Sequence, residues 1–395
     1  MAWKEWVSLE AHRQKIVSDE RGQSPRLQGM TLVELLVAVT VTSVVLVFIY
    51  GGFSAHRRLY GQEQQILELQ QNLRLALDMV VQVVHQAGYW RCVEARAVRI
   101  GAQGVKSTLK SSEGLFHTQA VMGFNNVTAT TDPFVDKQTR EGTDILGYSL
   151  IDPAFDGPLA HDQVLPRDPL RLVKNKATGS LKKGQIVFLT DCRQSALFQI
   201  TNVFTDGDTL LQHDPDVLSP GNTTRCLRCD DGGTTCVGDV ECSAAGTGFR
   251  RGISWLHPVK VGFFRVSKSG DFQWIEGGPD TTGNYVFSTP RTLAENVEDF
   301  QVEWGVDSSP VPDGLVDAWV SADAIPETFS GSGLRDWERV HAVRCHILGR
   351  TRRPFKGYTD TTVYAFADRK ASGAASDAYR RLHMMKTIGI RNAMP

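Results

Sequence analysis

Four cysteines form the densest group of reactive side chains in the sequence: Cys226, Cys229, Cys236 and Cys242, all within 17 residues. Their C-x2-C-x6-C-x5-C spacing could place four thiolates around a zinc ion. The alternative is two disulfides that staple a loop too short and polar to bury a core. Disulfides are favoured if the segment is exported to an oxidising compartment, although spacing alone does not give their connectivity.

Another cysteine, Cys345, lies in an alternating run with Val343 and Ile347. Such alternation is typical of a strand with one buried face, so we expect a buried and unreactive thiol. His341 shares this face, whereas His346 points to the opposite one. The sequence therefore predicts no metal site at these residues.

Three aspartates, Asp307, Asp313 and Asp317, surround Gly314 in an acidic segment that could supply oxygen ligands to calcium. The segment lacks the residue order of an EF-hand and its terminal glutamate. A solvated turn is the favoured interpretation, and no metal or cofactor is predicted.

Catalytic motifs are absent from the sequence, including the serine nucleophile elbow, the H-E-x-x-H zinc motif and the phosphate-binding loop. The segment starting Gly246-Thr247-Gly248 is one residue off a dinucleotide fingerprint. We therefore expect no enzyme activity. The formal net charge of −1 over 395 residues also gives no reason to predict nucleic-acid binding.

A single carboxylate, Glu34, is the only charge in the 24 residues 30–53. At about 1.5 Å per residue, a helix of this length reaches roughly 36 Å and spans a bilayer with some tilt. A secretory signal peptide is the alternative, but its apolar core is only about 7–15 residues long. A charge inside a membrane segment is costly unless it finds a partner, so Glu34 is a candidate functional residue.

The residues around Glu34 resemble the class III leader of type IV pilins and pseudopilins. The matching run is Gly29-Met30-Thr31-Leu32, followed by Glu34-Leu35-Leu36. The resemblance implies that a prepilin peptidase cuts between Gly29 and Met30, that Met30 becomes N-methylated, and that Glu34 is the fifth residue of the mature chain. An ordinary signal anchor is the alternative. The leader, residues 1–29, is longer than in many relatives, so it is either a longer variant or reflects the choice of start site.

Cleavage explains the buried charge physically. It creates an α-amino group at Met30, and a cation close to the Glu34 carboxylate removes most of the desolvation penalty. In the family this amine belongs largely to a neighbouring subunit of the filament. The resemblance therefore implies that Glu34 sets the register of subunit assembly.

The helical pattern continues beyond the membrane segment, with apolar residues at spacings of three and four: Ile66, Leu69, Leu73, Leu77, Val80 and Val84. No proline interrupts this pattern. Gly51-Gly52 is a flexible position within it, and Gly88 is expected to end the helix. We expect one helix from Met30 to about Gln86. Its transmembrane half is 30–53, and its amphipathic half, 54–88, packs on a globular head.

The head, residues 89–395, is predicted to be rich in β-strands and to lie in the periplasm or outside the cell. Strands are indicated at 144–151, 185–191, 196–203, 259–266, 272–276, 297–304 and 337–348, with a hairpin turn at Ser269-Gly270. Long loops are expected at 105–142, 152–182, 214–250 and 305–336, the third carrying the Cys-rich insert. The predicted fold class is α+β and type IV pilin-like, a long N-terminal helix packed on an antiparallel sheet.

Discontinuous blocks narrow the resemblance to PilW-like minor pilins: Ala87-Gly88-Tyr89-Trp90-Arg91-Cys92, Leu189-Thr190-Asp191-Cys192, the run 297–307, and the tail residues Arg380-Arg381 and Ile390-Arg391-Asn392. The segment 226–242 has no counterpart in the family pattern. Cys92 and Cys192 lie in two of these blocks. A disulfide between them is one of the alternatives in an oxidising compartment.

Three functional interpretations follow. By resemblance, the chain is a minor pilin of the inner membrane with a periplasmic head, which primes type IV pilus assembly and stays near the tip on the cell surface, supporting motility and adhesion. Its implied partners are other minor pilins, the major pilin, the prepilin peptidase, and the assembly platform with its motor. The second interpretation is a pseudopilin of a type II secretion system. The third is a membrane-anchored binding module, in which Glu34 has no purpose.

Overall fold

The structure, a computed structural model, describes residues 30–91, 105–110, 119–192, 194–215, 218–227, 248–287, 289–310, 313–325, 336–369 and 374–393. The chain divides into two compact units, Met1–Glu63 and Gln64–Pro395. One long helix, α2 (Leu32–Gln86), runs through the boundary between them. Short 3-10 helices are η2 (Thr178–Ser180), η3 (Ala322–Ala324), η4 (Trp337–Arg339) and η5 (Arg391–Ala393).

Helix α2 confirms the helix predicted from Met30 to about Gln86. Its 55 residues contain no proline, and Gly51 and Gly52 are helical. The predicted apolar face is buried from Leu69 to Val84, while Leu67 and Leu75 face solvent. The sequence period of about 3.6 residues therefore identified both the helix and the side that packs.

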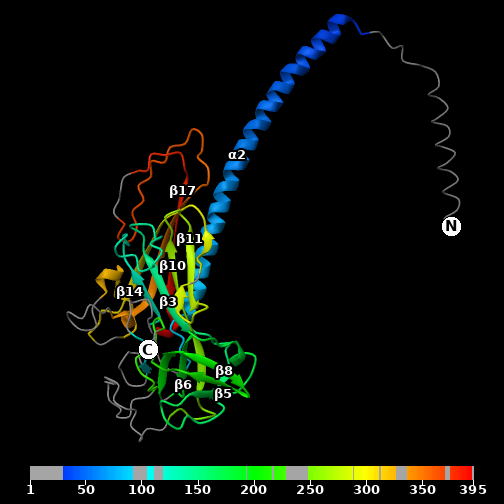
Figure 1. The fold of residues 1–395 in the computed structure, drawn as a ribbon. Coiled ribbons are helices and arrows are strands. Elements are labelled where there is room, and N and C mark those ends of the chain that lie inside the picture. Colours follow the sequence, from blue (N-terminus) through cyan, green and yellow to red (C-terminus); the bar gives the residue numbers. More distant parts are fainter. Residues whose placement is uncertain are drawn as a thin grey trace, which may run out of the picture. The chain divides into compact units, whose positions relative to one another are not determined.

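The described residues of the head form three sheets, whose strands are drawn as arrows in Figure 1. The largest has ten strands: β1 (Val105–Ser107), β2 (Val121–Phe124), β3 (Ile145–Ile151), β4 (Gly157–Pro158), β6 (Ile186–Thr190), β7 (Ser195–Gln199), β10 (Trp255–Val266), β11 (Phe272–Pro279), β12 (Tyr285–Phe287) and β13 (Arg291–Ala294). The second has the order β15 (Ala318–Val320), β14 (Val297–Val306), β16 (Val340–Arg350), β17 (Arg381–Gly389). The third has the order β5 (Leu170–Leu172), β9 (Asp208–Gln212), β8 (Asn202–Asp206).

Strand pairing within the described residues is antiparallel, except that β1 pairs with β7 in parallel. The predicted α+β fold with an antiparallel head is therefore confirmed. In Figure 1 strands β5, β6 and β8 gather at one end of the head and β17 lies toward the other. The first group is built on a separate apolar core that includes Leu170, Phe198 and Phe249.

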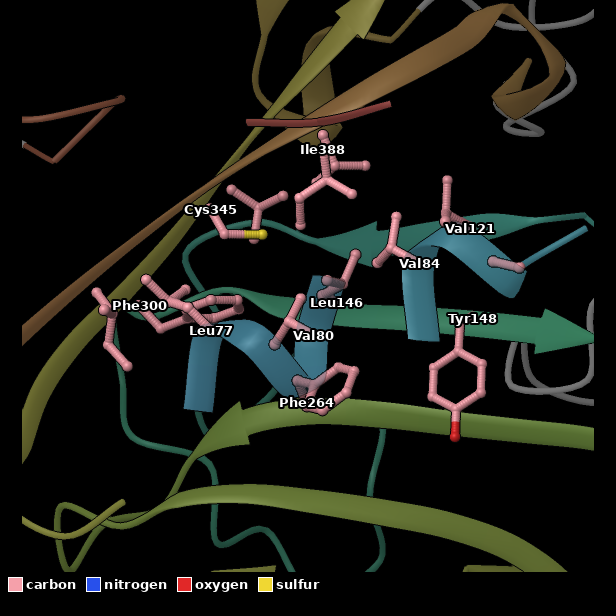
Figure 2. Close-up of a cluster of buried hydrophobic side chains, with 14 of the residues drawn as sticks. Leu77, Val80, Val84, Val121, Leu146, Tyr148, Phe264, Phe300, Cys345 and Ile388 are labelled. Atoms are coloured by element: carbon pink, nitrogen blue, oxygen red, sulfur yellow. The ribbon is translucent and has the colours of Figure 1, made fainter. Parts of the chain in front are cut away.

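The main core lies between α2 and the sheets. Figure 2 shows Leu77, Val80 and Val84 of the helix among Leu146, Phe264, Phe300 and Cys345 from four different strands. These side chains are almost completely buried. Burying a large aliphatic side chain contributes about 1.5–3 kcal/mol, so this face of α2 is a principal source of the stability of the head.

Several strand predictions need correction. The predicted strand 196–203 is divided between β7 and β8, and the predicted loops 105–142, 152–182 and 305–336 contain β1, β2, β4, β5 and β15. β9, β12, β13 and β17 were not predicted. Most of these strands are short or only half buried, so they lack the run of apolar residues on which strand prediction depends.

Candidate functional site

The start of α2 is a capping box. Glu34 Oε2 accepts hydrogen bonds from the backbone N–H of Thr31 at 2.9 Å and from its hydroxyl at 3.0 Å. In return, the Glu34 N–H donates to Thr31 Oγ1 at 3.3 Å. Threonine and glutamate at this spacing satisfy free amide groups at a helix start. The Glu34 carboxylate is thereby held against the peptide bond that follows Met30, beside the predicted new N-terminus.

The rest of the predicted transmembrane half exposes its apolar side chains, including Leu32, Phe48 and Phe53. By length and composition, α2 is the one helix among the described residues that is suited to cross a membrane. Three hydroxyl groups in this half are satisfied within the helix, because Thr40, Thr42 and Ser43 donate to carbonyl oxygens four residues earlier. Internal hydrogen bonding of this kind is what a hydrocarbon environment requires.

At the C-terminal end of α2, the block that contains Gly88 meets the tail block that contains Asn392. Gly88 has a φ of +73°, and a Cβ there would lie 2.6 Å from that of Ala120. Asn392 Nδ2 donates to the carbonyl oxygens of Gln86 at 3.4 Å and Ala87 at 3.0 Å. Asn392 therefore caps the helix, which gives the quoted Arg-Asn tail a structural role.

Beyond the helix end, Arg91 contacts β10. Its guanidinium lies over the Trp255 ring, 4.1 Å from the centroid, and its Nη1 donates to His257 Nε2 at 2.9 Å. Burial and the neighbouring Arg91 hold the pKa of His257 below its usual value, which keeps the ring neutral and able to accept this hydrogen bond. Trp255 also pairs with Thr190 of β6, two residues before Cys192.

The cysteines fall into two groups. Cys345 is free and buried in the main core, and burial raises the pKa of its thiol, as expected for an inert cysteine. Cys192 and Cys226 are disulfide-bonded, which favours disulfides over the zinc alternative for the insert. The remaining predicted disulfide cysteines, Cys92, Cys229, Cys236 and Cys242, lie outside the described residues.

We predict that Cys192 pairs with Cys92. Arg91, the residue before Cys92, stacks on Trp255, and Trp255 pairs with Thr190 close to Cys192. Non-reducing tryptic mapping of the full-length protein should therefore link peptide 92–96 to peptide 184–193. The insert cysteines should then pair only among themselves. A peptide joining Cys192 to the segment 226–242 would contradict the prediction.

The acidic loop is a hydrogen-bonded turn. The buried carboxylate of Asp307 accepts backbone N–H groups from Asp313 at 2.7 Å and Gly314 at 2.8 Å. Asp317 accepts the N–H of Ser308 at 2.8 Å. Across the described residues no group of three or more His, Cys, Asp and Glu side chains is arranged to hold a metal ion. Hydrogen bonds from the backbone to Asp307 and Asp317 therefore shape this loop.

Two segments of the chain match known families. Residues 25–50 match the prokaryotic N-terminal methylation motif, and residues 276–392 match the family described as type IV pilus-assembly protein W, PilW. The C-terminal part of the chain is therefore similar to PilW. No curated protein matches it. A type IV-like pilin, TTHA1219 from Thermus thermophilus, is similar at 16% identity over 35% of this chain and 67% of that one, with a TM-score of 0.21.

The PilW match confirms the resemblance, and it covers the run 297–307 and the tail residues. The blocks at 87–92 and 189–192 lie outside the matched residues. The match begins within β11 and ends at Asn392, so it contains the four-stranded sheet and the residue that caps α2. The methylation motif covers Gly29, Met30 and Glu34, although Gly29 lies outside the described residues. Thr31 is a functional candidate that we did not single out from the sequence, and the T-x-x-E spacing of a capping box was the signal that would have found it.

Proposed function

We propose that this PilW-like chain is a minor pilin that is cut between Gly29 and Met30, N-methylated at Met30, and joined to other pilins through Glu34. The observation that carries the proposal is the position of Glu34, the only charge in residues 30–53, inside a methylation motif. The capping box supports it, because Thr31 holds the carboxylate at the helix start.

The proposed charge pair has a physical rationale. A buried carboxylate is expensive without a cation, and removal of the leader would supply an α-amino group in every subunit. When the helix of one subunit enters a bundle of others, the amine of a neighbour can approach Glu34. A subunit displaced along the bundle would bury both charges unpaired, so the pair selects one register.

The proposed organisation assigns residues 1–29 to a cytoplasmic leader, 30–53 to the inner membrane, 54–88 to the amphipathic half of the helix, and 89–395 to a periplasmic head with the insert at 214–250. The protein would prime filament initiation with other minor pilins, meet the major pilin and remain near the tip. The prepilin peptidase would process it, and the assembly platform with its motor would extrude the filament. Motility and adhesion would then depend on it indirectly.

The first test is the N-terminus. Mass spectrometry of the protein purified from cells with an active prepilin peptidase should show a chain that begins at N-methylated Met30. The same protein from peptidase-deficient cells should retain residues 1–29, which serves as the control. An intact leader in both strains would rule out every pilin assignment.

The second test separates a pilus from a secretion system. A strain that lacks this gene should lose surface pili and continue to secrete proteins. Loss of secretion with normal piliation would favour a pseudopilin instead.

A further inference from the structure

The outer face of the four-stranded sheet carries two neighbouring histidines, one on β16 and one on β17. His346 Nδ1 lies 3.1 Å from His383 Nε2, and the two rings are almost parallel, with an interplanar angle of 5°. His346 Nε2 lies 2.9 Å from Glu303 Oε2 on β14. The side chains therefore form a chain of hydrogen bonds from a carboxylate through two imidazoles.

The chain of hydrogen bonds specifies where the protons lie. A carboxylate only accepts, so the Nε2 of His346 carries a proton and donates to Glu303. In the neutral ring, Nδ1 of His346 is then an acceptor, and Nε2 of His383 donates to it. One further proton can enter this pair without breaking the contact, because a change of tautomer leaves one of the two facing nitrogens as donor and the other as acceptor. Two imidazolium rings would direct N–H groups at each other across 3.1 Å, so the contact cannot survive full protonation.

These histidines hold a segment that crosses from β16 to β17. We call its described residues, 351–369 and 374–380, the strap, and residues 366–369 the anchor turn. Phe366 stacks on His383 with ring centroids 4.3 Å apart and on His346 at 5.5 Å. Asp368 accepts a hydrogen bond from Asn126 Nδ2 at 2.9 Å, and Arg369 pairs with Asp299 of β14. The anchor turn thus rests on the histidine pair.

The base of the strap is fastened separately. Backbone N–H groups of Phe355 and Asp360 donate to Ala378 and Asp377, each at 2.7 Å. Arg381 binds Asp360 at 3.0 Å and Asp377 at 2.7 Å. None of these contacts involves a histidine. Release of the anchor turn would therefore leave these contacts at the base of the strap intact.

Charged groups surround the histidine pair on every element that packs against it. β14 contributes Glu303 and Asp299, β16 contributes Arg344, which binds Glu303 at 3.1 Å, and the strap contributes Arg369, whose guanidinium lies over Phe366. The strap also contributes Asp368, whose carboxylate is bound by the Asn126 amide. Since Arg344 and Arg369 already pair with Glu303 and Asp299, a second imidazolium gains no free counter-charge from β14. It adds to the positive charge beside Arg369 instead.

We propose that the Glu303–His346–His383 chain is a proton-operated latch, which holds the anchor turn on the sheet at neutral pH and releases it when both imidazoles become protonated. The proposal depends on the head alone and goes beyond a role in pilus assembly. With such a latch, the docking of the anchor turn on the sheet would depend on the pH around the head.

The expected pH range follows from His383. Burial, and then the neighbouring His346, lower the pKa of His383 below its usual value of about 6.5. A histidine whose pKa is lowered in the docked state stabilises docking above the pKa of the released state and loses that effect as the pH falls. Release should therefore begin below about pH 6.5.

The test is native-state proteolysis of the full-length protein in detergent between pH 5 and 8. A broad-specificity protease active across this range would be used, with an unstructured reporter peptide in the same tube to correct for its own pH dependence. Cleavage within 361–369 should rise by up to about tenfold per pH unit as the pH falls from the pKa of His383 in the released state toward its lowered pKa in the docked state, because release takes up one proton in that range. Cleavage within 351–360 should not follow pH.

Three variants make the test decisive. His383→Gln keeps an amide donor for His346 but cannot take up a proton, so the anchor turn should stay protected across the range. His161→Gln removes an exposed histidine that pairs with Asp208 elsewhere and should behave like wild type. Asp299→Asn should retain the pH slope with weaker protection. A flat wild-type profile, or a wild-type slope in His383→Gln, would overturn the latch.

Discussion

Replacing Glu34 with leucine is expected to remove the protein from assembled pili while leaving it in the membrane. The apolar length of the helix is unchanged, so insertion should persist. The amine proposed to face Glu34 would be left buried and unpaired, and breaking a buried ion pair costs about 3–5 kcal/mol. Pilus-associated protein should fall by more than about a hundredfold relative to the membrane pool. Quantitative blotting of sheared pili and membranes measures both.

Glu34→Gln is the matched control for this prediction. Glutamine can complete a capping box with Thr31 but carries no charge. If the charge is what assembly requires, glutamine should fail like leucine. If capping alone is required, glutamine should assemble, and normal piliation with leucine would favour a simple membrane anchor.

Replacing Arg381 with methionine is expected to lower the free energy of unfolding of the head by about 3 kcal/mol or more. Only 5% of the Arg381 side chain is exposed, and three carboxylates surround it. Glu298 lies at 2.6 Å, Asp377 at 2.7 Å and Asp360 at 3.0 Å, and the last is fully buried. Methionine preserves much of the volume but leaves these negative charges together without their cation.

Lys260→Met is the control for Arg381. Lys260 pairs with Asp152 at 2.9 Å, but 48% of the lysine side chain is exposed. Exposed ion pairs contribute about 0–1 kcal/mol, so this variant should unfold close to wild type. Denaturant titration of the full-length proteins in detergent, followed by tryptophan fluorescence, compares the two. Equal losses in both variants would show that the buried cluster at Arg381 contributes no special stability.

Sequence reasoning predicted the features that depend on local pattern. The helix bounds followed from the spacing of Leu69, Leu73, Leu77, Val80 and Val84, and Glu34 was conspicuous as a lone charge in an apolar segment. The strand at 297–304 was also correct, although Val297 and Phe300 break strict alternation. The structure explains the break by a shift of register between Val297 and Asp299.

Features that depend on folding were not predictable. His346 and His383 are 37 residues apart and meet only because β17 pairs with β16. β17 itself was missed, since this edge strand carries Arg381, His383 and Lys386 among its apolar residues. Such mixed composition is common in edge strands and hides them from pattern recognition.

The cap on α2 also has a consequence for the order in which this protein matures. Asn392 closes the helix end at Gln86 from 306 positions later in the chain. In the topology that we propose, Gln86 would cross the membrane well before Asn392. Asn392 could then close the helix end only after the residues between them had been exported, and a subunit whose export stalled within them would keep that helix end uncapped.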